Sequence, residues 1–136
     1  TEEAKEALYQ VSGGDCRKLE NIMQSTASLS KEITEESIYS VASFAEPKEI
    51  QKILELCVKK DFKEAKKVLL ETMIKQGLSG LDVIKQIQRE AWNTNISDKA
   101  KLEMIKACGE AEFRMIEGSD EYVQLEALLA KFMLLE

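Results

Sequence analysis

Apolar residues recur three or four positions apart along almost the whole chain, and this spacing limits the fold more than any other feature. The segment 48–59 is the clearest case, because its apolar residues would form one stripe along a helix. These residues are Ile50, Ile53, Leu54, Cys57 and Val58. With one proline and six glycines in 136 residues, few positions interrupt a helix. We therefore predict an all-α fold.

Capping residues divide the chain into eight predicted helices. The helices are expected over residues 2–12, 15–28, 34–42, 48–59, 61–76, 79–91, 97–117 and 121–135. The best domain boundary is Ser43-Phe44-Ala45-Glu46-Pro47, because proline suits the first position of a helix and disfavours helix in the residue before it. The predicted architecture is a small three-helix bundle at 1–44 followed by a five-helix domain at 47–136.

Composition and charge argue against several classes of function. The chain contains no histidine, the side chain that most often serves as a general base or binds a transition metal. Its three cysteines are far apart and form no CxxC pair, so we predict neither a disulfide framework nor a metal site. The net charge of −6 argues against a free-standing nucleic-acid-binding protein. No run of about 18 apolar residues is present, so we expect no membrane contact.

The last two predicted helices carry apolar residues on more than one side. The two sides of the helix 97–117 are Leu102, Ile105, Phe113 and Ile116, and Met104, Cys108, Ala111 and Met115. Between Tyr122 and Leu135 only three residues are polar, namely Gln124, Glu126 and Lys131. A domain of about 90 residues has little room to bury two such helices. We therefore predict a homo-oligomer that forms through residues 98–135.

The segment Gly14-Asp15-Cys16-Arg17-Lys18 places two cations in the first turn of a predicted helix. The free N–H groups of that turn favour anions, so cations oppose the helix dipole unless an anion joins them. With a bound anion, the N–H groups and the guanidinium would converge on a phosphate-like group. The residues alone leave two interpretations open, an anion site or two solvated charges, and the spacing favours the second.

A second group of cations follows the predicted helix 48–59. It consists of Lys59, Lys60, Lys63, Lys66 and Lys67, interrupted by Asp61 and Glu64. We interpret this group as a solvated helix face, since the acidic residues interrupt its positive charge.

Several stretches resemble one protein family, the replication factor C small subunits of archaea. Gly14-Asp15-Cys16-Arg17-Lys18, followed by Asn21, is similar to the sensor 2 motif of that family, although Cys16 and Glu20 stand where apolar residues are usual. GLSGLDVI at 77–84, EAEFRMIEG at 110–118 and QLEALLA at 124–130 look like the C-terminal collar of the same family. Together these similarities span essentially the whole chain.

The resemblance implies an AAA+ lid domain at 1–44 and a collar at 47–136, which assembles the subunit ring of a clamp loader in DNA replication. It implies that Arg17 senses the phosphates of ATP, and that Gly14 and Asp15 shape the turn that presents it. The sequence contains no GxxxxGK[ST] phosphate loop and no Walker B strand. We therefore expect no catalytic residue and no cofactor in this fragment, whereas the intact subunit would be an ATPase that uses ATP and magnesium.

For assembly, the resemblance implies that the collar contacts other clamp-loader subunits, large and small. It also implies that the intact complex acts on the sliding clamp and primed DNA in the cytoplasm of an archaeal cell. The residues expected at the oligomer interface are Phe113, Arg114, Gln124, Leu125, Leu128, Leu129 and Phe132. The alternative from another functional class is a stand-alone helical adaptor whose apolar C-terminal helix docks a different protein.

Overall fold

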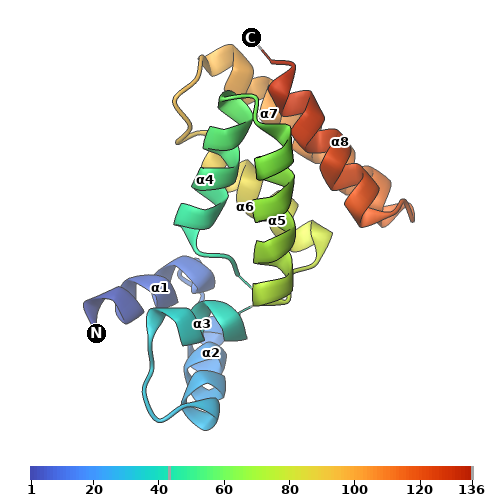
Figure 1. The fold of residues 1–136 in the computed structure, drawn as a ribbon. Helices are drawn as coiled ribbons and strands as arrows, with labels where there is room; N and C mark the ends of the chain where they lie inside the picture. The colour runs from blue at the N-terminus through green and yellow to red at the C-terminus, as the bar shows by residue number, and fades with distance from the viewer. Residues whose placement is uncertain (43, 136) are drawn as a thin grey trace. The chain divides into compact units, whose positions relative to one another are not determined.

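Every regular element of the computed structural model is an α-helix within the residues that it describes, 1–42 and 44–135, and the predicted all-α fold is confirmed. The helices are α1 Glu2–Ser12, α2 Cys16–Leu29, α3 Glu35–Val41, α4 Pro47–Val58, α5 Phe62–Gln76, α6 Gly80–Ala91, α7 Asp98–Ile116 and α8 Glu121–Met133 (Figure 1). Their contacts form two compact units, Thr1–Glu46 (unit 1) and Pro47–Glu136 (unit 2). Ser43, part of the predicted boundary, lies outside the described residues.

Local capping interactions confirm most of the predicted helix ends. At the start of α6, the Ser79 hydroxyl accepts the N–H of Asp82, and the Asp82 carboxylate accepts the N–H of Ser79. Asp61 and Ser97 each accept the N–H three residues further along, at the starts of α5 and α7. The last helix is shorter than predicted, since α8 ends at Met133. The N–H of Leu134 donates to the carbonyls of Ala130 and Lys131 and caps its last turn.

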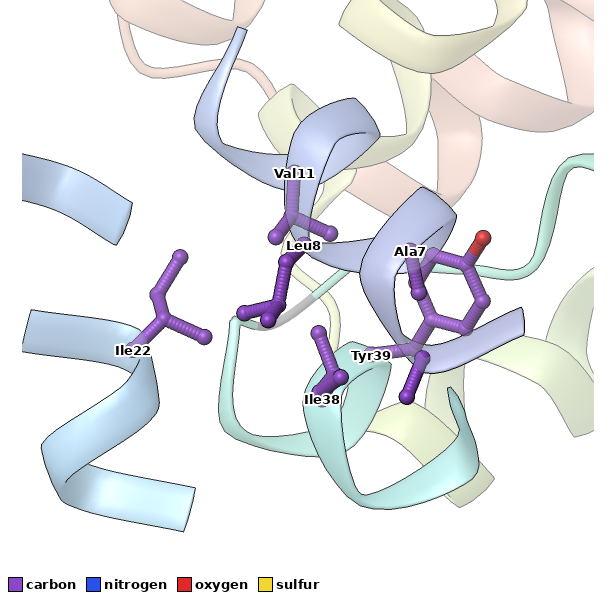
Figure 2. Packing of buried hydrophobic residues seen from close by; sticks show 7 residues of the cluster. Ala7, Leu8, Val11, Ile22, Ile38 and Tyr39 are labelled. Carbon is purple, nitrogen blue, oxygen red and sulfur yellow. The ribbon is translucent and has the colours of Figure 1, made fainter. Parts of the chain in front are cut away.

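The core of unit 1 is a small apolar cluster in which α1, α2 and α3 meet. Its buried members are Ala4, Ala7, Leu8, Val11, Ile22, Ile38 and Tyr39 (Figure 2). Only two residues of α2, Ile22 and Thr26, are buried. Because the other two short helices, α1 and α3, cover only one side of α2, most of this helix remains open to solvent.

Tyr39 combines apolar packing with a polar contact in the same cluster. Its hydroxyl donates a hydrogen bond to Oε1 of Gln10 at 3.0 Å, and its ring stacks on Phe44 with 6.0 Å between the ring centroids. Burial raises the pKa of Tyr39 to about 12, and the negative charge of Glu35 adds to this effect. The hydroxyl therefore remains protonated and acts as a donor at neutral pH.

Unit 2 buries one side of each of its five helices. The predicted stripe of α4 is buried at Ile50, Ile53, Leu54 and Cys57, but Val58 at the end of the helix is 42% exposed. The last helix, α8, contacts α4, α5, α6 and α7. Its buried side chains are Leu125, Leu128, Leu129, Phe132 and Met133. The centre of this unit is therefore the apolar side of α8.

A close approach joins the start of α6 to the start of α8. The Gly80 N–H, one of the free donors of the first turn of α6, donates to Oε2 of Glu121 at 2.9 Å. A Cβ atom at position 80 would lie 2.8 Å from Cβ of Glu121 and 3.1 Å from Sδ of Met115. Glycine is therefore required at this position by the neighbouring helices and not by backbone conformation.

Gly80→Ala should lower the free energy of unfolding by about 1–3 kcal/mol, because the added methyl group must displace Glu121 or Met115. The matched control is Gly109→Ala in α7, where nothing lies within 4 Å of the added Cβ. That control should raise stability by roughly 0.5–1 kcal/mol, as alanine does in helix interiors. Urea denaturation followed by circular dichroism measures both, and equal effects of the two substitutions would contradict the close packing at Gly80.

The three cysteines should differ sharply in reactivity, because Cys16 is exposed whereas Cys57 and Cys108 are buried. Burial raises the pKa of each buried thiol to about 12, so neither forms the reactive thiolate at neutral pH. A disulfide reagent should therefore label Cys16 alone in the native chain and all three cysteines in denaturant. If the native Cys16→Ser variant is labelled as fast as the unsubstituted chain, then Cys57 and Cys108 are not buried.

Candidate functional site

The turn between α1 and α2 is built from two glycines and an aspartate. Gly13 and Gly14 have φ angles of +60° and +85°, in the left-handed region that glycine tolerates best. The carboxylate of Asp15 then caps α2 by accepting the N–H groups of Arg17 at 2.9 Å and Lys18 at 3.2 Å. The predicted cap is confirmed, and it places Arg17 and Lys18 in the first turn of α2.

The side chains of Arg17 and Lys18 line an open groove of about 380 Å³ between α2 and the end of α3. Asn21 and Ser25, on the next turns of α2, extend the same wall, and Val41 of α3 lies across from them. Among the described residues no side chain forms an ion pair or hydrogen bond with the charged group of Arg17 or Lys18.

The charge of this groove favours an anion. The first turn of α2 contains no acidic residue, and the one carboxylate that lines the groove, that of Asp15, already accepts two backbone N–H groups. Two cations at the positive end of a helix are stabilised when an anion joins them. A planar guanidinium presents a rigid fork of N–H donors that matches two oxygens of a phosphate, whereas an ammonium group acts as a flexible point charge.

The predicted oligomer residues fall into two groups. Leu125, Leu128, Leu129 and Phe132 are at most 3% exposed, because this side of α8 packs on the other helices of its own unit. Within the chain these side chains offer a partner almost no surface, and their place in an interface stays a prediction. Phe113 and Arg114 are exposed and Gln124 is half-buried, so these three remain available.

The structure adds a set of exposed apolar residues on the outer sides of α7 and α8. Each of them is more than half exposed: Leu102, Phe113, Ile116, Tyr122, Val123 and Leu134. The two apolar sides predicted for α7 are both present, since Met104, Cys108 and Ala111 are buried and the opposite side faces outward. From the sequence, α8 is recognisable only as a helix with more apolar residues than one buried side needs. The sequence does not show which of these residues face the core and which face outward.

Two ion pairs border α8 on opposite edges. Lys131 contacts Glu110 of α7 at 2.7 Å, and Glu126 pairs with Lys66 of α5. The hydrogen bond from Lys131, with its positive charge, lowers the pKa of Glu110. At helical spacing, Val123 of α8 lies between these two edges.

The described residues contain no group of three or more histidine, cysteine, aspartate or glutamate side chains that could hold a metal ion. Among the same residues, no helix combines the length and the apolar character needed to cross a membrane.

Residues 45–131 match the family of the replication factor C C-terminal domain. The replication factor C small subunit of Methanococcus maripaludis strain S2 is 47% identical to this chain over 131 residues, which are 96% of this chain and 42% of that protein. The proteins of the same name from Pyrococcus furiosus and Methanocaldococcus jannaschii are each 42% identical over 135 residues. Those alignments cover 99% of this chain but 16% and 7% of the two relatives.

The chain thus spans about two-fifths of the length of the first of these relatives and a smaller share of the other two. The family match begins just before α4 and extends into α8, so it covers nearly all of unit 2. The sequence resemblance and the helical architecture agree with this match. The chain belongs to the replication factor C family, whose C-terminal domain it contains.

Proposed function

We propose that this chain is the C-terminal part of a clamp-loader small subunit. In this role unit 1 is the lid that senses bound ATP, and unit 2 is the collar that assembles the subunit ring. The family match and the names of the relatives support the proposal. The observation that carries the sensing role is the groove at the start of α2, which Arg17 and Lys18 line without a charged partner.

Arg17 is the better phosphate sensor of the two cations. The Asp15 carboxylate already occupies two of the free N–H groups of α2, so a phosphate must be bound mainly by side chains. The guanidinium offers a rigid fork of donors, whereas Lys18 provides a flexible point charge. Gly14 and Asp15 act indirectly, because they set the turn and the cap from which Arg17 extends.

The collar role uses the outward sides of α7 and α8. Monomeric proteins seldom leave so many large apolar side chains exposed unless the surface binds something. Aromatic and arginine side chains often dominate such interfaces, and Phe113 and Arg114 lie next to each other in α7. We place Leu102, Phe113 and Ile116 at the interface, with Arg114 and Gln124 as its polar members.

Separate units for sensing and assembly would allow a complex to change conformation without dissociating. An apolar interface can persist while weaker, nucleotide-dependent contacts form and break. The collar would hold large and small subunits together, and the intact complex would load the sliding clamp onto primed DNA in an archaeal cytoplasm. ATP and magnesium would be held mainly by the nucleotide-binding domain that precedes the lid, so the chain itself would catalyse nothing.

The alternative is an adaptor whose exposed apolar residues dock a different protein. The same residues favour it, since an outward apolar side does not identify its partner. The two functions predict different oligomeric states for the purified chain. A collar associates with copies of itself, whereas an adaptor stays monomeric without its partner. The molar mass in solution therefore separates them.

The chain should self-associate at roughly 100 μM, a concentration that populates even weak complexes. Phe113→Glu should reduce the molar mass, because it places a charge in the proposed interface, while circular dichroism remains unchanged. The matched control is Tyr9→Glu, which alters an equally exposed aromatic residue in unit 1. Sedimentation equilibrium measures all three chains. A monomeric unsubstituted chain, or equal effects of the two glutamates, would count against the collar.

In the full-length subunit, Arg17→Ala should slow ATP-dependent clamp loading by about ten- to a hundredfold. The reason is the loss of a charge-assisted contact worth roughly 1.5–3 kcal/mol. Arg17→Lys should recover only part of the rate, because lysine lacks the fork geometry. The matched control is Lys31→Ala, which removes another exposed cation of unit 1 and should leave loading unchanged.

Loading rates and DNA-stimulated ATPase activity give the comparison, and the mass of the complex reports assembly. Wild-type rates for Arg17→Ala would mean that Arg17 is a solvated surface residue. Failure of that variant to assemble would instead make Arg17 a packing residue, which its exposure argues against.

A further inference from the structure

The ends of α4 and α8 and the start of α7 surround an apolar hollow at one end of unit 2 (Figure 1). Its volume is about 330 Å³, and its walls include Cys57, Met104 and Phe132. Val58, which is 42% exposed, also lines it, so the hollow is open to solvent on that side. Since an apolar cavity of about 150 Å³ takes a benzene molecule, the hollow has room for the ring of a phenylalanine.

Exposed apolar side chains lie near the opposite end of α7. Phe113 and Ile116 are 65% and 64% exposed. From Ala100, in the wall of the hollow, to Phe113 the helix rises by about 20 Å. The two also lie on different sides of α7, because Ala100 and Met104 belong to its buried side whereas Phe113 faces outward.

This placement limits how two copies of the chain could join through these surfaces. If Phe113 entered the hollow in a two-fold contact, the hollow and Phe113 of one copy would both have to meet the same partner. Surfaces at opposite ends and on different sides of a helix do not suit that arrangement. They suit a head-to-tail contact, in which each copy offers Phe113 to one neighbour and its hollow to another.

Apolar fit, and not charge, distinguishes these two surfaces. The hollow carries Lys60 in its wall, and Glu103 lies in the smaller hollow beside it. Phe113 likewise stands between an acidic and a basic neighbour, Glu112 and Arg114. Since both signs of charge occur at both surfaces, the burial of an exposed aromatic ring is the interaction that favours the contact.

We propose that Phe113 of one copy inserts into the apolar hollow of the next copy, so that copies of unit 2 join head to tail. This inference rests on the collar function proposed above, and it adds the surface that receives Phe113. A dimer formed in this way keeps one free hollow and one free Phe113. Association therefore continues past the dimer until the last copy meets the first.

The test uses Val58→Glu, which places a charge at the hollow, together with Phe113→Glu. Each variant alone should associate at least tenfold more weakly than the unsubstituted chain and be largely monomeric at roughly 100 μM. An equimolar mixture should form dimers and nothing larger, because one chain supplies the intact hollow and the other supplies Phe113. The matched control is Ile74→Glu, which alters another exposed apolar residue of unit 2 and should leave the molar mass unchanged.

Sedimentation equilibrium gives these masses, and circular dichroism checks that each variant is folded. A photoreactive benzoylphenylalanine at position 113 identifies the neighbour directly, since it should crosslink to residues of the hollow such as Met104. Crosslinks to the outer side of another α7 would overturn the inference. The same holds if Val58→Glu associates normally, if the mixture stays monomeric, or if the unsubstituted chain stops at a dimer; in each case except the last two variants' failure to fold, the collar itself still stands. An unsubstituted chain that is monomeric would overturn both the inference and the collar.

Discussion

Unit 2 depends on the burial of one side of α8. Each of the large apolar side chains on that side contributes about 1.5–3 kcal/mol when it leaves water. Because α8 contacts all four other helices of the unit, the loss of this packing would remove their common neighbour. Three polar contacts also join α8 to its neighbours, and they involve Glu126 with Lys66, Lys131 with Glu110, and Glu121 with the Gly80 N–H.

The same geometry explains why apolar residues remain outside. In the described part of unit 2, the neighbouring helices cover one side of α7 and one side of α8, and none of them covers the sides that carry Phe113 and Val123. A partner on those outer sides would not disturb the core, since Leu125 and Leu129 point into it from the opposite side of α8. Assembly and folding of this unit can therefore use different residues of the same helices.

Two hollows of the chain differ in how they could be recognised. The groove at Arg17 is built by residues close together in the sequence, from the Gly13-Gly14 turn through the Asp15 cap to Asn21, and a local motif indicates it. The hollow of about 330 Å³ lined by Cys57, Met104 and Phe132 has no such motif, because its walls come from the ends of α4 and α8 and the start of α7. Lysine is also not the residue that predicts a left-handed turn, so the φ of +61° at Lys60 in its wall could not be predicted.

The sequence by itself determined where most helices begin, because capping depends on residues such as Ser79 and Asp82 that are three positions apart. It also determined the short motif that contains Arg17. Only the tertiary structure decided which apolar side of α8 forms the core, because apolar residues around a helix look alike until other helices pack against one side. That packing separates buried Leu125 from exposed Val123, and it brings Cys57, Met104 and Phe132 of three different helices around one cavity.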